Sequence, residues 1–215
     1  MDGKKAKSSK SRIALFLEQY NISLLTVILL AASLYFFVGA HRMRSATTAS
    51  NPHLFSTGDI VDIVNVVDGD EVLIGDGEGN NTLFRLLGIK SFSATVSDPL
   101  LSEYGKICFT YLKAKTANQT ARLEIADKGL DTEGRLLGTL FLKDSQGAYT
   151  VDLGLDLVQK GYTLVYTRFD FAGMKGYLDI QKLAQEEKAS LWSNERITAR
   201  ALALQLLWDE EKQND

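Results

Sequence analysis

The feature that most constrains this 215-residue chain is a stretch without charge near its N-terminus. Between Glu18 and His41 no residue is charged, and Leu, Ile, Val, Ala and Phe dominate. A helix of about 20 residues is about 30 Å long, which matches the hydrocarbon thickness of a bilayer. A buried helix of a soluble domain would show a polar face, whereas here only scattered Ser and Thr side chains interrupt the apolar run. We predict that residues 21–40 form a single transmembrane helix.

A cleavable signal peptide is the alternative, because small residues end the run at Val38-Gly39-Ala40. About 20 residues precede the run, and the run is longer than the apolar part of most signal peptides, so a retained anchor is favoured. Five basic residues precede the run and two follow it. The positive-inside rule then places the N-terminus on the cytoplasmic or matrix side and the rest of the chain on the opposite face. The sequence leaves open the organelle (mitochondrial, endomembrane or cell surface) and cleavage of the N-terminal segment.

The small net charge of −3 hides a strong asymmetry. Residues 1–44 contain seven Lys and Arg against two acidic residues, a net +5, whereas residues 45–215 contain 17 basic and 25 acidic residues, a net −8. Nucleic-acid-binding domains usually present a basic patch to the phosphates, so this acidic excess disfavours a nucleic acid partner. The only cysteine, Cys108, excludes an intramolecular disulfide, and we expect it to be a small core residue.

The pattern beyond the apolar run predicts a basic segment over 1–20, a linker over 41–56, one domain over 57–195 and a C-terminal helix and tail over 196–215. Within helix 102–117 we expect Ile107, Tyr111 and Ala114 to share one face, with Phe109 beside it. The order of strands and helices predicts a five-stranded Greek-key barrel, an OB-fold, with helices packed outside it. The expected strands are 59–67, 71–74, 82–89, 122–125 and 136–142, the last two joined by a loop over 127–135. The expected helices are 102–117, 152–160, 177–191 and 197–212.

Several short motifs in this order resemble the staphylococcal nuclease (thermonuclease-like) domain family. They are Val66-Val67-Asp68-Gly69-Asp70-Glu71-Val72, Phe84-Arg85-Leu86-Leu87-Gly88-Ile89, Glu103-Tyr104-Gly105, Glu133-Gly134-Arg135, Leu157-Val158-Gln159-Lys160-Gly161 and Leu191-Trp192-Ser193. The resemblance covers about residues 57–195. It implies an OB barrel with three helices and calcium-dependent hydrolysis of phosphodiester bonds, in which the cation is held by oxygen ligands.

The resemblance also implies roles for individual residues. Asp70 stands at a calcium-ligand position, and Arg85 and Arg135 stand at the positions of the two catalytic arginines. Lys90, however, stands where the family has a second calcium-binding carboxylate, and Ser93 stands where it has the catalytic glutamate. We therefore regard the site as eroded, and expect calcium only if activity is retained and no other cofactor.

We expect Lys90 to form a salt bridge with Asp70 in place of a metal site, which would leave Arg85 and Arg135 available to an anion. A simpler interpretation stays open for each of two residues. Asp70 would only cap a tight turn. Arg135 would only be a solvated charge in a polar loop. Trp192 is expected to anchor the last helix of the family domain by packing.

Two principal function hypotheses follow. In the first, the chain is a single-pass membrane protein whose degenerate nuclease domain is a binding or assembly module for a protein or a small phosphate-bearing ligand. In the second, it is an active membrane-tethered nuclease that hydrolyses DNA or RNA. A purely structural anchor domain is a third interpretation.

Overall fold

A computed structural model describes residues 26, 29–30, 33, 35 and 51–214 of the chain. The five described residues before residue 51 are helical. Most of the predicted transmembrane helix at 21–40 lies outside the described residues, as do residues 1–20 and 41–50. Among the described residues, no helix has both the length and the apolar character that crossing a membrane requires. The described residues from 51 onward belong to one compact unit.

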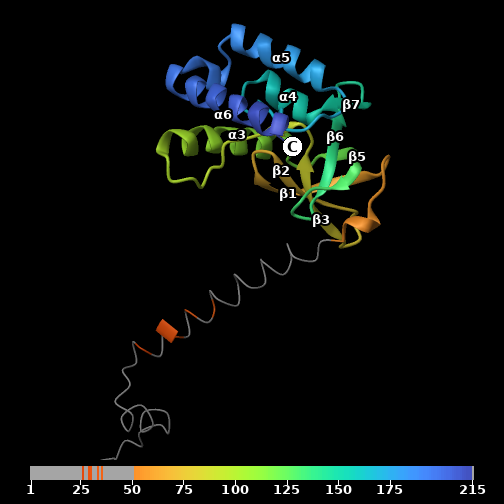
Figure 1. Cartoon of the computed structure of the whole chain (residues 1–215). Helices are drawn as coiled ribbons and strands as arrows, with labels where there is room; N and C mark the ends of the chain where they lie inside the picture. Colours follow the sequence, from red (N-terminus) through yellow and green to blue (C-terminus); the bar gives the residue numbers. More distant parts are fainter. Residues whose placement is uncertain (1–25, 27–28, 31–32, 34, 36–50, 215) are drawn as a thin grey trace, which may run out of the picture. The chain divides into compact units, whose positions relative to one another are not determined.

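Five strands close into a barrel, as the sequence predicted (Figure 1). The strand order is β3-β2-β1-β5-β6, and a parallel pairing of β3 with β6 closes the circle. This closed barrel with helices packed on it fits an OB-fold. Its strands are β1 (Ile60–Asp68), β2 (Glu71–Gly75), β3 (Asn81–Leu86), β5 (Thr120–Leu130) and β6 (Leu136–Lys143).

Alternating side chains fill the barrel interior. Every second residue of β3 and β6 is buried, among them Phe84, Leu86 and Leu140, which is the period of a strand with one face in the core. The strand β7 (Tyr149–Asp152) pairs with β6, and the short strands β4 (Ile89–Lys90) and β8 (Leu164–Val165) pair with each other. Phe55 follows the 3-10 helix η1 (Pro52–Leu54) and is also buried in the barrel core.

The loop predicted over 127–135 is wrong in its extent. β5 continues to Leu130, which pairs with Leu136 after a register shift that follows Ile125. The irregularity in this strand hides its alternation from a sequence pattern. The connection to β6 is therefore confined to residues 131–135.

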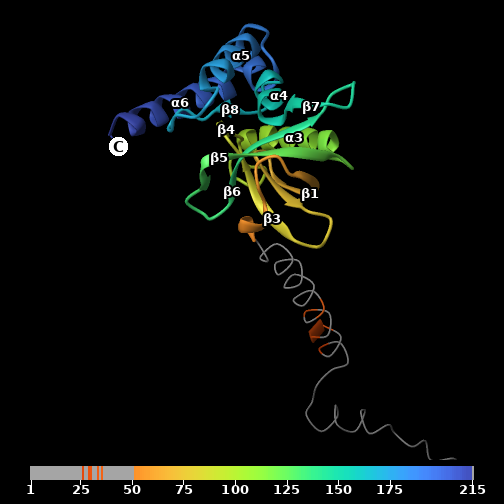
Figure 2. The same ribbon diagram turned by 90° about the vertical axis from the view of Figure 1, so that its right-hand side faces the viewer.

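Four helices pack outside the barrel (Figures 1 and 2). Helix α3 begins earlier than predicted, because Asp98 caps it by accepting hydrogen bonds from the backbone N–H groups of Leu100 and Leu101, and Pro99 occupies its first turn. At the start of α4, Asp152 caps the helix as expected. The helices are α3 (Pro99–Thr116), α4 (Leu153–Gln159), α5 (Met174–Glu186) and α6 (Glu195–Asn214), with the 3-10 helix η2 (Ser190–Ser193) before α6.

The buried face of α3 is not the row of Ile107, Tyr111 and Ala114. Gly105, Cys108 and Leu112 face the protein, whereas Ile107 is 38% exposed. Small residues let the helix backbone approach closely, and a Cβ at Gly105 would lie 2.5 Å from the carbonyl carbon of Ser93. A hydrophobicity pattern favours large apolar side chains over these small ones. Cys108 is fully buried, as predicted.

A second apolar cluster joins the C-terminal helix to the domain. It includes Trp192, as predicted, together with Ile197, Ala201 and Trp208 of α6. The Trp208 ring packs edge-on against Tyr166, with ring centroids 4.8 Å apart. The predicted C-terminal helix therefore packs against the domain, and Figure 2 shows it running outward to the C-terminal end.

Candidate functional site

Asp70 lies buried at the turn between β1 and β2. Its side chain is 1% exposed, and both of its carboxylate oxygens have partners. Oδ1 accepts a hydrogen bond from Nη1 of Arg85 at 2.7 Å, and Oδ2 accepts one from the backbone N–H of Ser91 at 2.8 Å. The turn itself is capped by Asp68, which accepts from the N–H of Gly69. Asp70 is thus a buried ion-pair partner and not the cap of the turn.

Lys90 supplies a second cation to the same carboxylate. Its Nζ lies 3.8 Å from Oδ2 of Asp70, which confirms the predicted salt bridge. Lys90 is on β4, the short strand that follows β3 and pairs with β8. Two cations and one backbone N–H therefore surround a single buried carboxylate.

Arg85 reaches this carboxylate from β3. Its guanidinium is 11% exposed and also donates from Nη2 to the carbonyl oxygen of Ile89 at 3.3 Å. The cross-strand partner of Arg85 on β2 is Glu71, and its neighbour on β6 is Leu137. The barrel register therefore places Arg85 beside Glu71, which in turn pairs with Arg135 in the loop before β6.

Arg135 lies in that loop and has three carboxylate neighbours. Its Nη1 lies 2.7 Å from Oε2 of Glu71 and 3.2 Å from Glu133, and its Nη2 lies 2.6 Å from Oδ2 of Asp131. Asp131 also accepts hydrogen bonds from the backbone N–H groups of Glu133 and Arg135, which fixes the loop. Arg135 is thus a paired and half-buried charge and not a solvated one.

These groups form one charge cluster at this end of the barrel. Three cations meet four carboxylates, so an external anion at either guanidinium would compete with carboxylates already bound there. Glu71 and Asp131 were not among the residues singled out from the sequence, although Asp131 is four residues before Arg135. The members of the charge cluster are Asp70, Glu71, Arg85, Lys90, Asp131, Glu133 and Arg135.

Burial and pairing compete within the charge cluster. Burial raises the pKa of Glu71 above its ordinary value, and the nearby Arg135 and Arg85 offset only part of this effect. Burial acts on Asp131 in the same direction, but hydrogen bonds from the Arg135 side chain and from backbone N–H groups outweigh it and lower the pKa of Asp131. Burial alone would lower the pKa of Arg135, yet Asp131 and Glu71 together raise it. Arg135 therefore stays charged and holds its loop to β2.

The residues present do not fit a calcium site. A hard divalent cation needs several oxygen ligands, most of them from carboxylates or carbonyls. Asp70 offers a carboxylate whose oxygens already meet Arg85, Lys90 and a backbone N–H. Among the described residues, no group of three or more His, Cys, Asp or Glu side chains is arranged to hold a metal ion.

Ser93 lies in the loop between β4 and α3. Its hydroxyl is 3.1 Å from that of Thr95, and its backbone packs against Gly105 of α3. A serine hydroxyl needs an activating base to act on water at neutral pH. The chain has only two histidines, His41 and His53, and both precede the barrel strands. Ser93 consequently supplies no general base.

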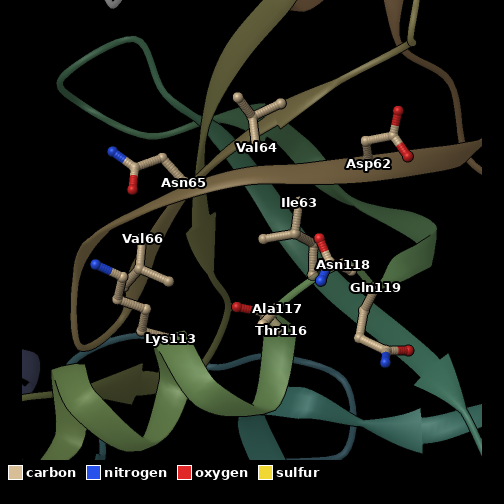
Figure 3. A pocket seen from close by; sticks show the side chains of 10 residues that line it. All are labelled: Asp62, Ile63, Val64, Asn65, Val66, Lys113, Thr116, Ala117, Asn118 and Gln119. Carbon is tan, nitrogen blue, oxygen red and sulfur yellow. The ribbon is translucent and has the colours of Figure 1, made fainter.

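A separate groove lies between β1 and the C-terminal end of α3. It has a volume of about 430 Å³, and Figure 3 shows side chains from both elements around it. Its lining includes one cation, Lys113, and one carboxylate, Asp62, and none of its residues belongs to the charge cluster. The groove is lined by Asp62, Ile63, Val64, Asn65, Val66, Lys113, Thr116, Ala117, Asn118 and Gln119.

The domain is a closed five-stranded barrel with packed helices. Arg85 lies near the end of β3, and Arg135 lies directly before β6. Together these features define a nuclease-like OB domain. The sequence profile described as staphylococcal nuclease homologue matches residues 83–194, and the chain belongs to that family. The chain is similar to the thermonuclease of Staphylococcus hyicus, with 26% identity over 133 residues, 61% of this chain and 75% of that protein. It is also similar to the thermonuclease of Staphylococcus intermedius, with 27% identity over 133 residues, 60% of this chain and 74% of that protein.

Proposed function

We propose that this domain is a degenerate nuclease barrel that binds or assembles with a partner and does not hydrolyse phosphodiester bonds by a calcium-dependent route. The observation that carries the proposal is the buried Asp70 carboxylate, which pairs with Arg85 and Lys90. In the calcium chemistry of the family, this carboxylate would have to face the metal. Here it serves as the counter-ion of two side chains.

Electrostatics oppose a cation at this position. At an effective dielectric constant of 20, two unit charges 4 Å apart interact by about 4 kcal/mol. The Lys90 ammonium in place of a ligand carboxylate changes the local charge by two units beside any divalent ion. The nearby Glu71 does not compensate, because its carboxylate pairs with Arg135. Every carboxylate of the charge cluster thus already has a cationic side chain as its partner, without a metal ion.

We also propose that the domain is tethered to a membrane by one helix over residues 21–40. The uncharged run and the basic residues on its N-terminal side support this proposal. The described residues of the run are helical, with Leu29, Leu30 and Tyr35 strongly exposed, as lipid-facing side chains would be. The N-terminus then lies on the cytoplasmic or matrix side, with the domain on the opposite face.

The acidic surface guides the choice of partner. Residues 45–215 carry a net charge of −8, which disfavours a nucleic acid. A protein partner and a small phosphate-bearing ligand are the two remaining candidates. At Arg85 or Arg135, a phosphate group would compete with the carboxylates that are already paired there. We therefore favour a protein partner.

A cleavage assay tests the proposal. The full-length chain in detergent is incubated with single-stranded DNA or RNA, with and without calcium, beside the Staphylococcus hyicus thermonuclease as a positive control. We expect no calcium-dependent cleavage and no rise in melting temperature with calcium. Calcium-dependent cleavage that an Arg85→Lys variant abolishes would show an active tethered nuclease and overturn the proposal.

A reversal of the two eroded positions sharpens the test. Lys90→Asp combined with Ser93→Glu removes the ammonium from Asp70 and adds two carboxylates at the site. If Lys90 is what keeps calcium out, this variant is expected to show a calcium-dependent rise in melting temperature. Lys106→Asp with Thr110→Glu makes the same charge change on α3, away from the charge cluster, and serves as the matched control.

For the tether, extraction of cell membranes with alkaline carbonate gives a direct readout. The full-length chain is expected to stay in the membrane pellet. Release into the supernatant would exclude an integral anchor. N-linked glycosylation at the exposed Asn118 in the triplet Asn118-Gln119-Thr120 would place the domain on a lumenal or external face.

A further inference from the structure

Helix α6 presents an apolar row on the side that faces away from the domain. Its inward side is anchored by Ile197, Ala201 and Trp208, which are buried. The opposite side exposes three leucines, at 45%, 65% and 48% for Leu202, Leu206 and Leu207, and two alanines. We call this surface the α6 outer face, made of Ala199, Leu202, Ala203, Leu206 and Leu207.

Charges flank the α6 outer face with opposite signs at its two ends. Arg196 and Arg200 lie in the first two turns, and Asp209 and Glu210 lie in the later turns, all of them exposed. Glu195 is exposed at the first position of the helix, where it complements the helix dipole. Arg200 also lies 3.8 Å from Asp98 of the domain and is still 66% exposed.

One cation and one anion of α6 lie in the same row as Ala203, the residue in the middle of the α6 outer face. Arg196, Ala203 and Glu210 are seven residues apart from one another, and residues at a spacing of seven share one side of a helix. In an antiparallel pair of helices with a two-fold axis at Ala203, Arg196 of each copy lies opposite Glu210 of the other. A parallel pair would instead bring like charges together.

We propose that the α6 outer face binds the same face of a second copy of this chain, as an antiparallel helix pair with Ala203 at the two-fold axis. Isologous contacts of this kind are the commonest form of homodimer. The small Ala199 and Ala203 let the two backbones approach, and the leucines cover the contact on both sides. The acidic end of α6 disfavours an anionic membrane surface as the occupant. The inference is independent of whether the barrel is catalytic.

Site-directed cross-linking tests this pairing on the full-length chain in detergent. Ala203→Cys places a thiol at the proposed axis, where a short bismaleimide can join two copies. The native Cys108 is fully buried and stays unreactive in the folded chain. Lys182→Cys, an exposed position on α5, is the matched control. We expect a cross-linked dimer at position 203 in several-fold excess over position 182, and equal yields would overturn the proposal.

Charge reversal tests the direction of the helix pair. With Ala203→Cys in the background, Arg196→Glu and Glu210→Arg are each expected to lower the cross-linked fraction several-fold. An equal mixture of the two variants, given tags of different size, should restore a heterodimer, because each altered charge then meets its opposite. Far-UV circular dichroism checks that the variants stay folded. A cross-linked fraction that Arg196→Glu does not change, or a mixture that fails to recover, would refute antiparallel pairing.

Discussion

Replacing Arg85 by methionine tests whether the charge cluster is a structural ion-pair network. The change removes the guanidinium from Asp70 and keeps an unbranched side chain of similar length. Asp70 is only 1% exposed, so its charge would lose its closest partner without gaining water. Leaving one charge of a buried pair without its partner costs about 3–5 kcal/mol.

The two remaining contacts set the expected size of the effect. Asp70 keeps the backbone N–H of Ser91 at 2.8 Å and the Nζ of Lys90 at 3.8 Å, and the lysine is 43% exposed. We therefore expect a loss at the lower end of that range, about 3 kcal/mol. For a domain of this size, about 2–4 °C is lost per kcal/mol, which gives a drop in melting temperature of roughly 6–12 °C.

Chemical denaturation of the purified chain at neutral pH measures this loss. Arg122→Met is the control, because Arg122 is partly exposed, lies 3.9 Å from Glu124 and lies over the Phe141 ring, and losing these contacts should cost no more than about 1–2 kcal/mol. The double variant Asp70→Asn with Arg85→Met leaves no unpaired buried charge and should be no less stable than Arg85→Met alone. Equal losses for Arg85→Met and Arg122→Met, or strictly additive losses in the double variant, would refute the reasoning.

Three further predictions concern other parts of the domain. Because burial raises the pKa of Glu71, its native carboxyl binds a proton more tightly than in the unfolded chain, so its contribution to the free energy of unfolding should fall as pH rises above the ordinary value of 4.5. Because burial also raises the pKa of Asp152 in both proteins, denaturation of the parent and of Glu71→Gln across that range should show a steeper decline in the parent, and parallel profiles would contradict it. Trp208→Ala should cost about 3–4 kcal/mol and speed proteolysis of α6, because it empties the second apolar cluster; unchanged proteolysis would show that α6 is held elsewhere. Burial raises the pKa of the Cys108 thiol, so a thiol reagent should label it only in denaturant, and rapid labelling of the folded chain would place it at the surface.

Much of the barrel could be predicted from residue patterns. The β-branched run of β1 and the turn at Asp68-Gly69-Asp70 marked the first two strands, since these residues favour strands and tight turns respectively. The extended end of β5 escaped prediction because the register shift before Leu130 breaks its alternation. The buried face of α3 escaped because Gly105 and Cys108 face the protein, and small residues contribute little to a hydrophobic pattern.

Of the charge cluster, the sequence indicated Asp70, Arg85, Lys90 and Arg135, and it predicted the salt bridge of Lys90. That prediction required only opposite charges at two positions that the family places together. Glu71 was not foreseen, because its contact with Arg135 joins residues 64 positions apart and depends on strand register.

By itself, the sequence determined the barrel and the family, because strand periodicity and short motifs are local properties of the chain. It also predicted that Lys90 and Ser93 stand at two positions where the family has acidic residues. Only the tertiary structure decided what the remaining site residues do. The closure of β3 against β6 and the pairing of β2 with β3 bring Glu71 and Asp131 to Arg135, and Asp70 to Arg85. Buried charges require close partners of opposite sign, and which partners are close is set by the fold of the whole barrel.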